Sequence, residues 1–373
     1  MVEVVRRRGA VEEKTTPADR VFHEAGNVVE RMRAAFERAS RQCASELRET
    51  DLVLGGQPIK LRTVGSDLHR RVTRPLAHLE ASPPRVNAES IGLTIELWDE
   101  LETGVSCSGF EIDDSLDAGK GDVVTVSPDS RYVSLRRARS HAVYDRKDRK
   151  IIGWSRNGDR VSLIELGRPM QYLFCYWFRD ANLQLIHSGM VGQDGVGVIV
   201  TGRSGSGKST TCLVCLAGGL SYLSDDVLVM SGTRRTGFVG HSVYGSNHVA
   251  PRDVERFPQL AKHARGGGCG KEDKWVVMLH EAFPGRVVPS LPIRAIALPR
   301  VVDQPKSSYQ RAPKAGALMT IAPSSIVLIE GAMQEGLHRL GELVENVPAY
   351  WVNLGRDFWS TPDCMRALIA EVR

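Results

Sequence analysis

Apolar residues recur at helical spacing near the start of the chain. The pattern predicts a helix within residues 17–49, with its apolar positions at Val21, Ala25, Val28, Met32, Ala35 and Ala39. The segment DLVLGGQPIKLRTVG then alternates like two strands around a Gly-Gly turn, and DLHRRVTRPLAHLE predicts a short helix. Residues 1–20 lack such a pattern and are expected to be disordered. Since Pro83-Pro84 interrupts the pattern, we expect a helical N-terminal region over residues 21–88.

Residues 89–168 alternate between apolar and polar positions in short, punctuated runs, which predict a mostly antiparallel β-rich region. Its expected strands lie in GLTIELWDE, GDVVTVSPD, RYVSLRR, HAVYDRKDRKIIGWSR and RVSLIEL. We expect this region, with the helix before it, to recognise a substrate or partner.

The remaining residues, 169–373, mix helical and strand patterns and predict an α/β fold with a mixed sheet and flanking helices. A helix is expected from Pro169 to about Asn182, and residues 234–274 are expected to be rich in loops. A helix is also expected in KSTTCLVCLAGG, and strands are expected in LQLIHSGMV, GVGVIVTG, YLSDDVLVM, LPIRAIALPRVV and SSIVLIE. The tail predicts a helix, the strand AYWVNLG and a last helix.

The segment GRSGSGKS, residues 202–209, fits the phosphate-binding pattern G-x-x-x-x-G-K-[ST] directly between an expected strand and an expected helix. Its glycines allow the backbone to turn N–H groups toward an anion, and the helix N-terminus adds positive charge. Lys208 would reach the outer phosphates, and the Ser209 hydroxyl would bind Mg²⁺. The expected nucleotide contacts are Gly202, Ser204, Gly205, Ser206, Gly207, Lys208, Ser209 and Thr210. The alternative is a glycine-rich turn without a ligand.

Two adjacent acids, Asp225 and Asp226, follow this loop closely in YLSDDVLVM. One carboxylate can hold Mg²⁺ while the other accepts the proton of an attacking hydroxyl. Because neighbouring residues in a regular strand face opposite sides, both can serve only with a local bend or with different roles. Two acids beside a triphosphate imply a metal ion, whereas the alternative is an exposed Asp-Asp turn.

The order of His187, the loop and the acid pair in LIHSGMVGQDGVGVIVTGRSGSGKST and LSDD resembles the HPr kinase/phosphorylase-like kinases, bacterial relatives of phosphoenolpyruvate carboxykinase. The resemblance covers residues 169–230 and extends loosely to NVPAYWVNLGRDF. It implies a P-loop core of mixed sheet and ATP-dependent phosphorylation of a serine hydroxyl. Asp225 would be the general base, and Asp226 would bind the metal or orient His187. Thr210 stands where HPr kinases carry glutamate, and their later signature is absent; GSNHVAPRDVERFPQL is the nearest region.

A few charged residues beyond the motifs are weaker candidates. Lys271 and Lys274 in GCGKEDKW could close over phosphates, and Arg252 or His248 could act similarly. Each could equally be an ordinary solvated side chain. Cys212 and Cys215 form a CxxC inside an expected helix, where we expect them to pack as small buried residues.

Composition excludes several other classes. The 373 residues carry a net charge of +5 and no apolar run long enough for a membrane helix, and charges interrupt the N-terminus where a signal peptide would be apolar. We therefore expect a cytoplasmic protein that binds no membrane. The densest basic segment, residues 130–160, is expected to be the solvated face of a hairpin and has few aromatic residues, so nucleic acid is not the expected partner.

Three functions fit these patterns. The first is an ATP- and Mg²⁺-dependent kinase for a serine or similar hydroxyl of a protein or peptide, with a small-molecule hydroxyl as the alternative acceptor. The second is an ATPase or nucleotide-dependent switch, in which the acids position water. The third is a binding module that uses nucleotide for assembly. The sequence leaves open whether the chain forms a homo-oligomer.

Overall fold

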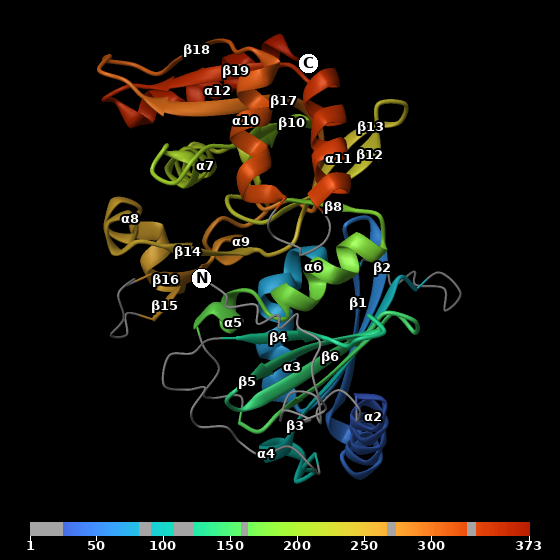
Figure 1. Cartoon of the computed structure of the whole chain (residues 1–373). Helices are drawn as coiled ribbons and strands as arrows, with labels where there is room; N and C mark the ends of the chain where they lie inside the picture. The colour runs from blue at the N-terminus through green and yellow to red at the C-terminus, as the bar shows by residue number, and fades with distance from the viewer. Residues whose placement is uncertain (1–24, 82–90, 108–121, 158–162, 267–273, 327–332) are drawn as a thin grey trace, which may run out of the picture. The chain divides into compact units, whose positions relative to one another are not determined.

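The chain folds into two compact units of mixed α/β structure, as the computed structural model shows for residues 25–81, 91–107, 122–157, 163–266, 274–326 and 333–373 (Figure 1). The first unit contains the chain up to Val53 with Gln57–Arg74 and Glu80–Trp177. The second contains Phe178–Arg373 and two short insertions, Leu54–Gly56 and Pro75–Leu79. The expectation of an α/β protein with mixed sheets is confirmed.

The first unit is built on a seven-stranded sheet in the order β1-β2-β3-β7-β6-β5-β4. Its strands are β1 (Leu47–Leu54), β2 (Gln57–Val64), β3 (Leu93–Asp99), β4 (Val123–Val126), β5 (Tyr132–Arg137), β6 (Ser140–Asp145) and β7 (Lys150–Ser155). The helices of this part of the chain are α2 (Ala25–Gln42), α3 (Ser66–Thr73), α4 (Glu100–Thr103), α5 (Leu163–Gly167) and α6 (Gln171–Asp180), with the 3₁₀ turns η1 (Ala44–Glu46) and η2 (Arg74–Leu79).

The expected hairpin is present, because Gly55 and Gly56 both adopt positive φ, 62° and 77°, as a two-residue turn between strands requires. However, β2 pairs in parallel with β3, so the two regions expected for residues 21–88 and 89–168 share one sheet. β3 also pairs in parallel with β7, whereas β4, β5, β6 and β7 pair antiparallel in succession, so the strands of residues 89–168 are mostly antiparallel, as expected, within a mixed sheet. The described part of RVSLIEL forms helix α5 instead of a strand.

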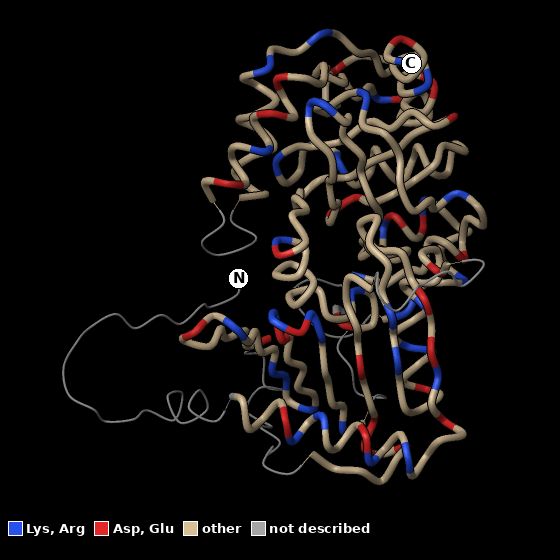
Figure 2. The backbone as a smooth tube through the Cα atoms, turned by 90° about the vertical axis from the view of Figure 1, so that its right-hand side faces the viewer, with Lys and Arg blue, Asp and Glu red and all other residues tan. Residues whose placement is uncertain are grey.

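Charged side chains form a ladder across this sheet. Glu96 on β3 is 4% exposed and accepts hydrogen bonds from Arg62 on β2 at 2.7 Å and from Lys150 on β7 at 3.1 Å. Figure 2 shows basic and acidic positions on neighbouring strands of the same sheet.

In the basic segment 130–160, Arg131 binds Asp145 at 2.9 Å. Some of its positive charge is therefore already paired within the unit.

The second unit has a larger sheet in the order β11-β9-β10-β17-β13-β12-β8, and β19 pairs with both β17 and β18. The strands are β8 (Gln184–Ile186), β9 (Gly189–Gln193), β10 (Val196–Val200), β11 (Ser221–Ser224), β12 (Leu228–Thr233), β13 (Gly237–Ser242), β17 (Ser290–Val301), β18 (Ser308–Arg311) and β19 (Ala349–Leu354). A three-stranded sheet contains β14 (Ser246–Val249), β15 (Ala264–Gly266) and β16 (Trp275–Met278). The helices are α7 (Lys208–Ala217), α8 (Pro251–Arg256), α9 (Leu279–Ala282), α10 (Lys314–Ser325), α11 (Met333–Asn346) and α12 (Thr361–Glu371), with the 3₁₀ turns η6 (Pro258–His263) and η7 (Phe358–Ser360).

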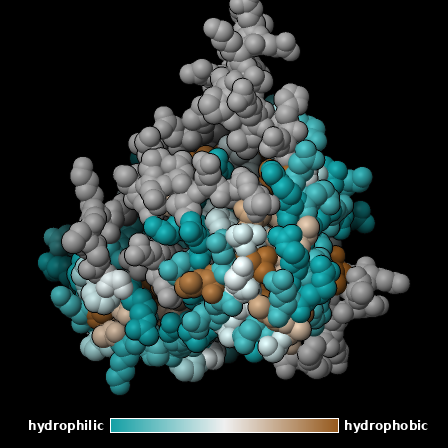
Figure 3. Space-filling model, turned by 90° about the horizontal axis from the view of Figure 1, so that it is seen from below, coloured by the Kyte–Doolittle hydropathy of each residue, from teal (hydrophilic) through white to brown (hydrophobic). Residues whose placement is uncertain are grey.

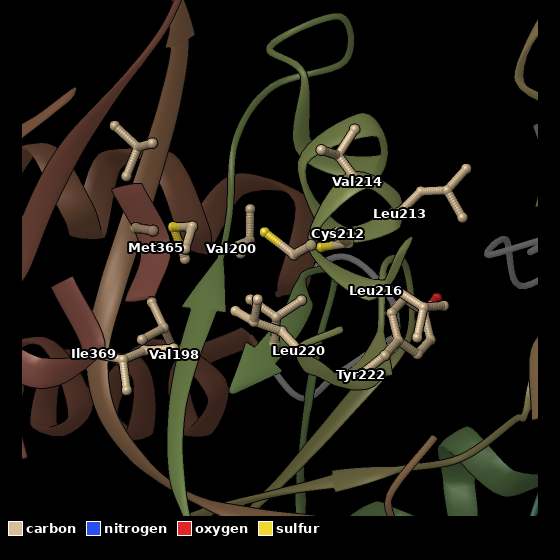
Figure 4. Close-up of a cluster of buried hydrophobic side chains, with 14 of the residues drawn as sticks. Val198, Val200, Cys212, Leu213, Val214, Leu216, Leu220, Tyr222, Met365 and Ile369 are labelled. Carbon is tan, nitrogen blue, oxygen red and sulfur yellow. The ribbon is translucent and has the colours of Figure 1, made fainter. Parts of the chain in front are cut away.

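Alternate residues of the central strands face two separate cores. Val198 and Val200 of β10 pack with α7 and α12, whereas Ile199 packs with α10 and α11. Figure 4 shows the first core, in which Cys212, Leu216, Met365 and Ile369 belong to the cluster around β10. The parallel pairs β10·β17 and β17·β19 therefore lie between two helical layers.

Several predicted segments of the second unit differ in detail. LQLIHSGMV is not one strand but two, with a break at His187 and Ser188, and YLSDDVLVM is broken at residues 225–227. The region 234–274, expected to be rich in loops, also contributes β13, β14, α8, η6 and β15. In SSIVLIE, residues 324–325 end helix α10 instead of starting a strand, and residues 327–330 lie outside the described part. The expected tail of helix, strand and helix is confirmed as α11, β19 and α12.

Hydrophilic residues predominate on the face drawn in Figure 3, where hydrophobic residues occupy small areas. Within the described ranges, no helix has the length and apolarity needed to cross a membrane.

A buried histidine predicts acid sensitivity. Burial lowers the pKa of His241 to about 4, and its Nε2 lies 2.8 Å from the Ser231 hydroxyl. In the unfolded chain the same imidazole titrates near pH 6.5, so its stabilising contribution is full above that pH and is lost as pH falls toward 4. Between pH 7.5 and pH 5, we expect His241→Gln to reduce the loss of unfolding free energy by about 2 kcal/mol. Urea unfolding at both pH values tests this, with exposed His338→Gln as the control; equal losses in the wild type and His241→Gln would contradict it.

Candidate functional site

Two interruptions of strand pairing lie opposite one another in the second unit. β8 pairs with β12 through Ile186 and Leu228, and β9 pairs with β11 through Met190 and Ser224. Between these pairs, His187 and Ser188 on one segment and residues 225–227 on the other lie outside the strands. The two predicted strands are therefore interrupted at matching positions. His187 lies in one interruption and the acid pair lies in the other.

His187 and Asp226 form the contact across this break. His187 Nε2 lies 2.7 Å from Asp226 Oδ1, and their side chains are 37% and 34% exposed. The His187 N–H donates to the hydroxyl of Ser325 at 3.1 Å, and that hydroxyl donates to the carbonyl of Ile321 within α10. The histidine is thus held from two sides, while its ring and the carboxylate remain accessible to solvent.

Asp225 does not face His187 but is buried beside Tyr222. It is 5% exposed, and the Tyr222 hydroxyl donates to its Oδ1 at 3.3 Å. Burial and then the charge of Asp225 raise the pKa of the Cys212 thiol on α7 well above its usual value. The two acids occupy a bend after β11, so they can face different partners. Within this bend the Asp226 N–H donates a hydrogen bond to the Ser224 hydroxyl at 3.1 Å.

The loop of residues 202–209 joins the end of β10 to the start of α7. Gly205 and Gly207 adopt φ of 80° and 93°, a backbone conformation that side chains disfavour. A Cβ on Gly207 would lie 2.5 Å from Leu354 Cδ1 at the end of β19. Glycine is therefore required at position 207 both for its torsion and for its close packing.

Three hydroxyls in and beside this loop are buried without a hydrogen-bond partner among the described residues: those of Thr201, Ser206 and Thr211. Thr201 is fully buried and Thr211 is 2% exposed. A buried hydroxyl without a partner is costly, so these groups favour a ligand or water with oxygen atoms at this place.

The loop and the His187–Asp226 pair lie at the same edge of the sheet. β9 runs antiparallel to β10, with Gly189 opposite Val200, so residues before Gly189 lie beyond the end of β10. A Cβ on Gly189 would come within 3.0 Å of Asp225 Cα and 2.9 Å of the Ser224 carbonyl oxygen, and it would also collide with Cys212 Sγ. The absence of a side chain at Gly189 therefore allows α7, β9 and the acid pair to approach one another.

The other candidates are placed less centrally. Of the loop residues, Ser204 and Ser209 are exposed, and Gly202, Lys208 and Thr210 are half-buried. Lys274 is exposed at the start of β16, and Lys271 lies outside the described residues. Arg252 is exposed on α8 and His248 half-buried on β14. Cys212 and Cys215 are fully buried in α7, as predicted.

The sequence patterns missed two residues that hold the site, Tyr222 and Ser325. Tyr222 resembles any apolar strand residue, and its contact with Asp225 depends on the bend. Ser325 lies in a segment that was expected to be a strand, so its contact with His187 followed from no sequence signal.

The residues at this edge suit Mg²⁺ held mainly by a substrate. Among the described residues, no group of three or more His, Cys, Asp or Glu side chains could hold a metal ion by itself. Mg²⁺ in nucleotide sites commonly uses one or two protein oxygens with phosphate oxygens and water. Ser209, Asp225 and Asp226 are oxygen donors of the required kind.

Comparisons with known proteins find likeness among solved structures alone. No family model matches the chain, and no curated protein matches it. Among solved structures, the Hpr(Ser) kinase/phosphatase from Coxiella burnetii matches 50% of this chain and 93% of its own, with 14% sequence identity and a TM-score of 0.29. A likeness of this size assigns no activity to the chain.

Gly189 provides a test of the site's packing. We expect Gly189→Ala to displace Asp225 and Cys212 and to destabilise the protein by about 1–3 kcal/mol, as overpacking does. Urea unfolding measures this loss, and Cys212→Ala in the same chain should recover part of it by removing the Sγ. Gly341→Ala on α11 is the control, because a Cβ there meets nothing within 4 Å. Equal stabilities of the Gly189 and Gly341 variants would contradict the packing argument.

Proposed function

We propose that the protein is an ATP- and Mg²⁺-dependent kinase with a P-loop core like that of the HPr kinases, which transfers the γ-phosphate to a serine or similar hydroxyl of a protein or peptide. The observation that carries the proposal is the position of the His187–Asp226 pair at the edge of the sheet where the 202–209 loop begins. A loop that holds phosphates and an accessible acid–base pair are the two parts that phosphoryl transfer to a hydroxyl requires.

The loop would hold the nucleotide through its backbone and two side chains. Its N–H groups and the start of the ten-residue helix α7 favour phosphate oxygens. Lys208 would bind the outer phosphates, and the Ser209 hydroxyl would help to hold Mg²⁺. When bound, Mg²⁺ neutralises charge that develops on the transferred group. The three buried hydroxyls without partners support a ligand of this kind.

The exposures of the two acids favour different roles for them. A general base must reach the proton of the acceptor hydroxyl. Asp226 is 34% exposed and in contact with His187, whereas Asp225 is 5% exposed and faces α7. We therefore assign proton acceptance to the Asp226–His187 pair and the organisation of the metal side to Asp225, the reverse of the roles that the resemblance implies.

Loss of Lys208 tests nucleotide binding. We expect Lys208→Ala to weaken the binding of ATP·Mg²⁺ by tenfold or more, because its ammonium would contact the outer phosphates directly. Isothermal titration calorimetry with ATP measures this, and Lys262→Ala, on η6, is the matched control. If the wild type does not bind ATP in the presence of Mg²⁺, the proposed function fails.

The acid–base pair gives a second test. We expect Asp226→Asn to slow phosphoryl transfer by about 10²–10⁴-fold, because the base is lost, while ATP affinity changes little. His187→Gln should also slow transfer, and the double variant should be no slower than the more impaired single variant, since the two residues act as one unit. Transfer from [γ-³²P]ATP into protein of a host lysate is the measurement.

The same assay separates the kinase from an ATPase. A kinase leaves label on a protein or small acceptor in an Asp226-dependent way, whereas an ATPase releases inorganic phosphate only. Release of phosphate alone, at a rate that Asp226→Asn leaves unchanged, would show that the acid–base pair has no part in the reaction.

A further inference from the structure

We propose that Arg300 is an oxyanion-binding residue of this site and recognises a phosphate or carboxylate group of one of the two reactants. The inference rests on the proposed function only for the identity of the reactants, since anion binding at Arg300 can be measured without any transfer reaction.

The position of Arg300 follows from strand register. β17 pairs with β10 in parallel, with Ala297 beside Val200, the last residue of β10. Arg300 comes three residues later on β17, so it lies beyond the end of β10, at the edge where the 202–209 loop begins. Adjacent strands are about 5 Å apart, which places Arg300 one strand from the loop.

The side chain of Arg300 lies on the same face of the sheet as the contact that holds His187. Its guanidinium carbon lies 5.0 Å from the centre of the Trp351 ring. Trp351 packs against the core that contains residues of α10. Helix α10 also carries Ser325, which binds the His187 backbone. Arg300 and the Ser325 contact that holds the His187 backbone therefore belong to one side of the sheet.

Two contacts hold the guanidinium in place although the residue is exposed. Its Nε donates to Asn353 Oδ1 at 2.6 Å, and Asn353 is 8% exposed. The Asn353 Nδ2 is directed to the Ser308 hydroxyl at 3.3 Å, which fixes the amide with its oxygen toward Arg300. Stacking on Trp351 restrains the guanidinium plane. An arginine held in this way loses less conformational entropy when it binds a ligand.

Neither Nη group of Arg300 has a hydrogen-bond or carboxylate partner within the described residues. By contrast, Arg356, which follows β19, pairs with Asp303 at 3.0 Å. A guanidinium that uses its Nε for support keeps the two Nη groups for a planar oxyanion, which arginine binds through two parallel hydrogen bonds. The arrangement therefore fits a phosphate or carboxylate better than a neutral group.

The oxyanion can come from the nucleotide or from the acceptor, and two titrations distinguish them. The first measures ATP·Mg²⁺ binding by calorimetry at low salt. The second measures inorganic phosphate binding to protein already saturated with a non-hydrolysable ATP analogue and Mg²⁺, so that the loop is filled. Each is done with the wild type, Arg300→Gln, Arg300→Lys and the control Arg356→Gln, after circular dichroism shows equal folding.

We expect Arg300→Gln to weaken one of these binding reactions by about tenfold or more, and Arg300→Lys to recover little, because lysine lacks the fork and the Nε contact. Weaker ATP binding assigns the oxyanion to the nucleotide. Loss of phosphate binding to the saturated protein assigns it to the acceptor. Affinities for both within twofold of the wild type, as expected for Arg356→Gln, overturn the proposal.

The inference and the proposed function can fail separately. If the wild type does not bind ATP, a direct titration with pyrophosphate replaces the first measurement. A tenfold difference between the wild type and Arg300→Gln would then support anion binding while the kinase proposal fails. Absence of any phosphate or pyrophosphate binding by the wild type overturns both.

Discussion

The close approach of three backbone segments at Gly189 is the constraint on which the site depends. β9 begins there, β11 ends beside it, and α7 brings Cys212 against the same point. A Cβ on Gly189 of β9 would meet both of the other segments, so the three can meet only at a residue without a side chain. Because α7 starts in the 202–209 loop and β11 leads into the acid pair, this contact packs the helix that follows the loop close to the acids.

The same packing explains why two adjacent acids can serve one site. In a continuous strand they would face opposite cores, and one would be buried among apolar residues. The chain instead leaves the strand after Ser224, so Asp225 turns toward Tyr222 and α7 while Asp226 reaches His187. The difference in exposure, 5% for Asp225 and 34% for the Asp226 side chain, follows from this bend. Asp225 is thereby held against Tyr222, whereas Asp226 stays accessible beside His187.

The sequence predicted the elements around the site better than the breaks that form it. The spacing of glycines, Lys208 and Ser209 located the loop between β10 and α7, because that motif and its flanking periodicities are local. The interruption at His187 was not predicted, and a bend at Asp225 and Asp226 was only one of two alternatives, since LQLIHSGMV and YLSDDVLVM each alternate as one strand. The two segments stop at matching positions only because β9 pairs with β11 and β8 pairs with β12, and these strands are far apart in the sequence. The contacts of Ser325 and Asn353 depend on similar long-range register.

Interrupted pairing leaves backbone N–H groups that must find other partners, and serine side chains supply them here. The N–H of Asp226 donates to the Ser224 hydroxyl, and the N–H of His187 donates to the Ser325 hydroxyl. An unpaired buried N–H costs about 1–3 kcal/mol, so without these hydroxyls the two breaks would tend to close into regular strands. A serine is small enough to fit where the ladder ends and accepts one bond while donating another, as Ser325 does to Ile321. His187 and Asp226 are thus held by the groups that stabilise their irregular backbone, which ties the geometry of the candidate site to the stability of the fold around it.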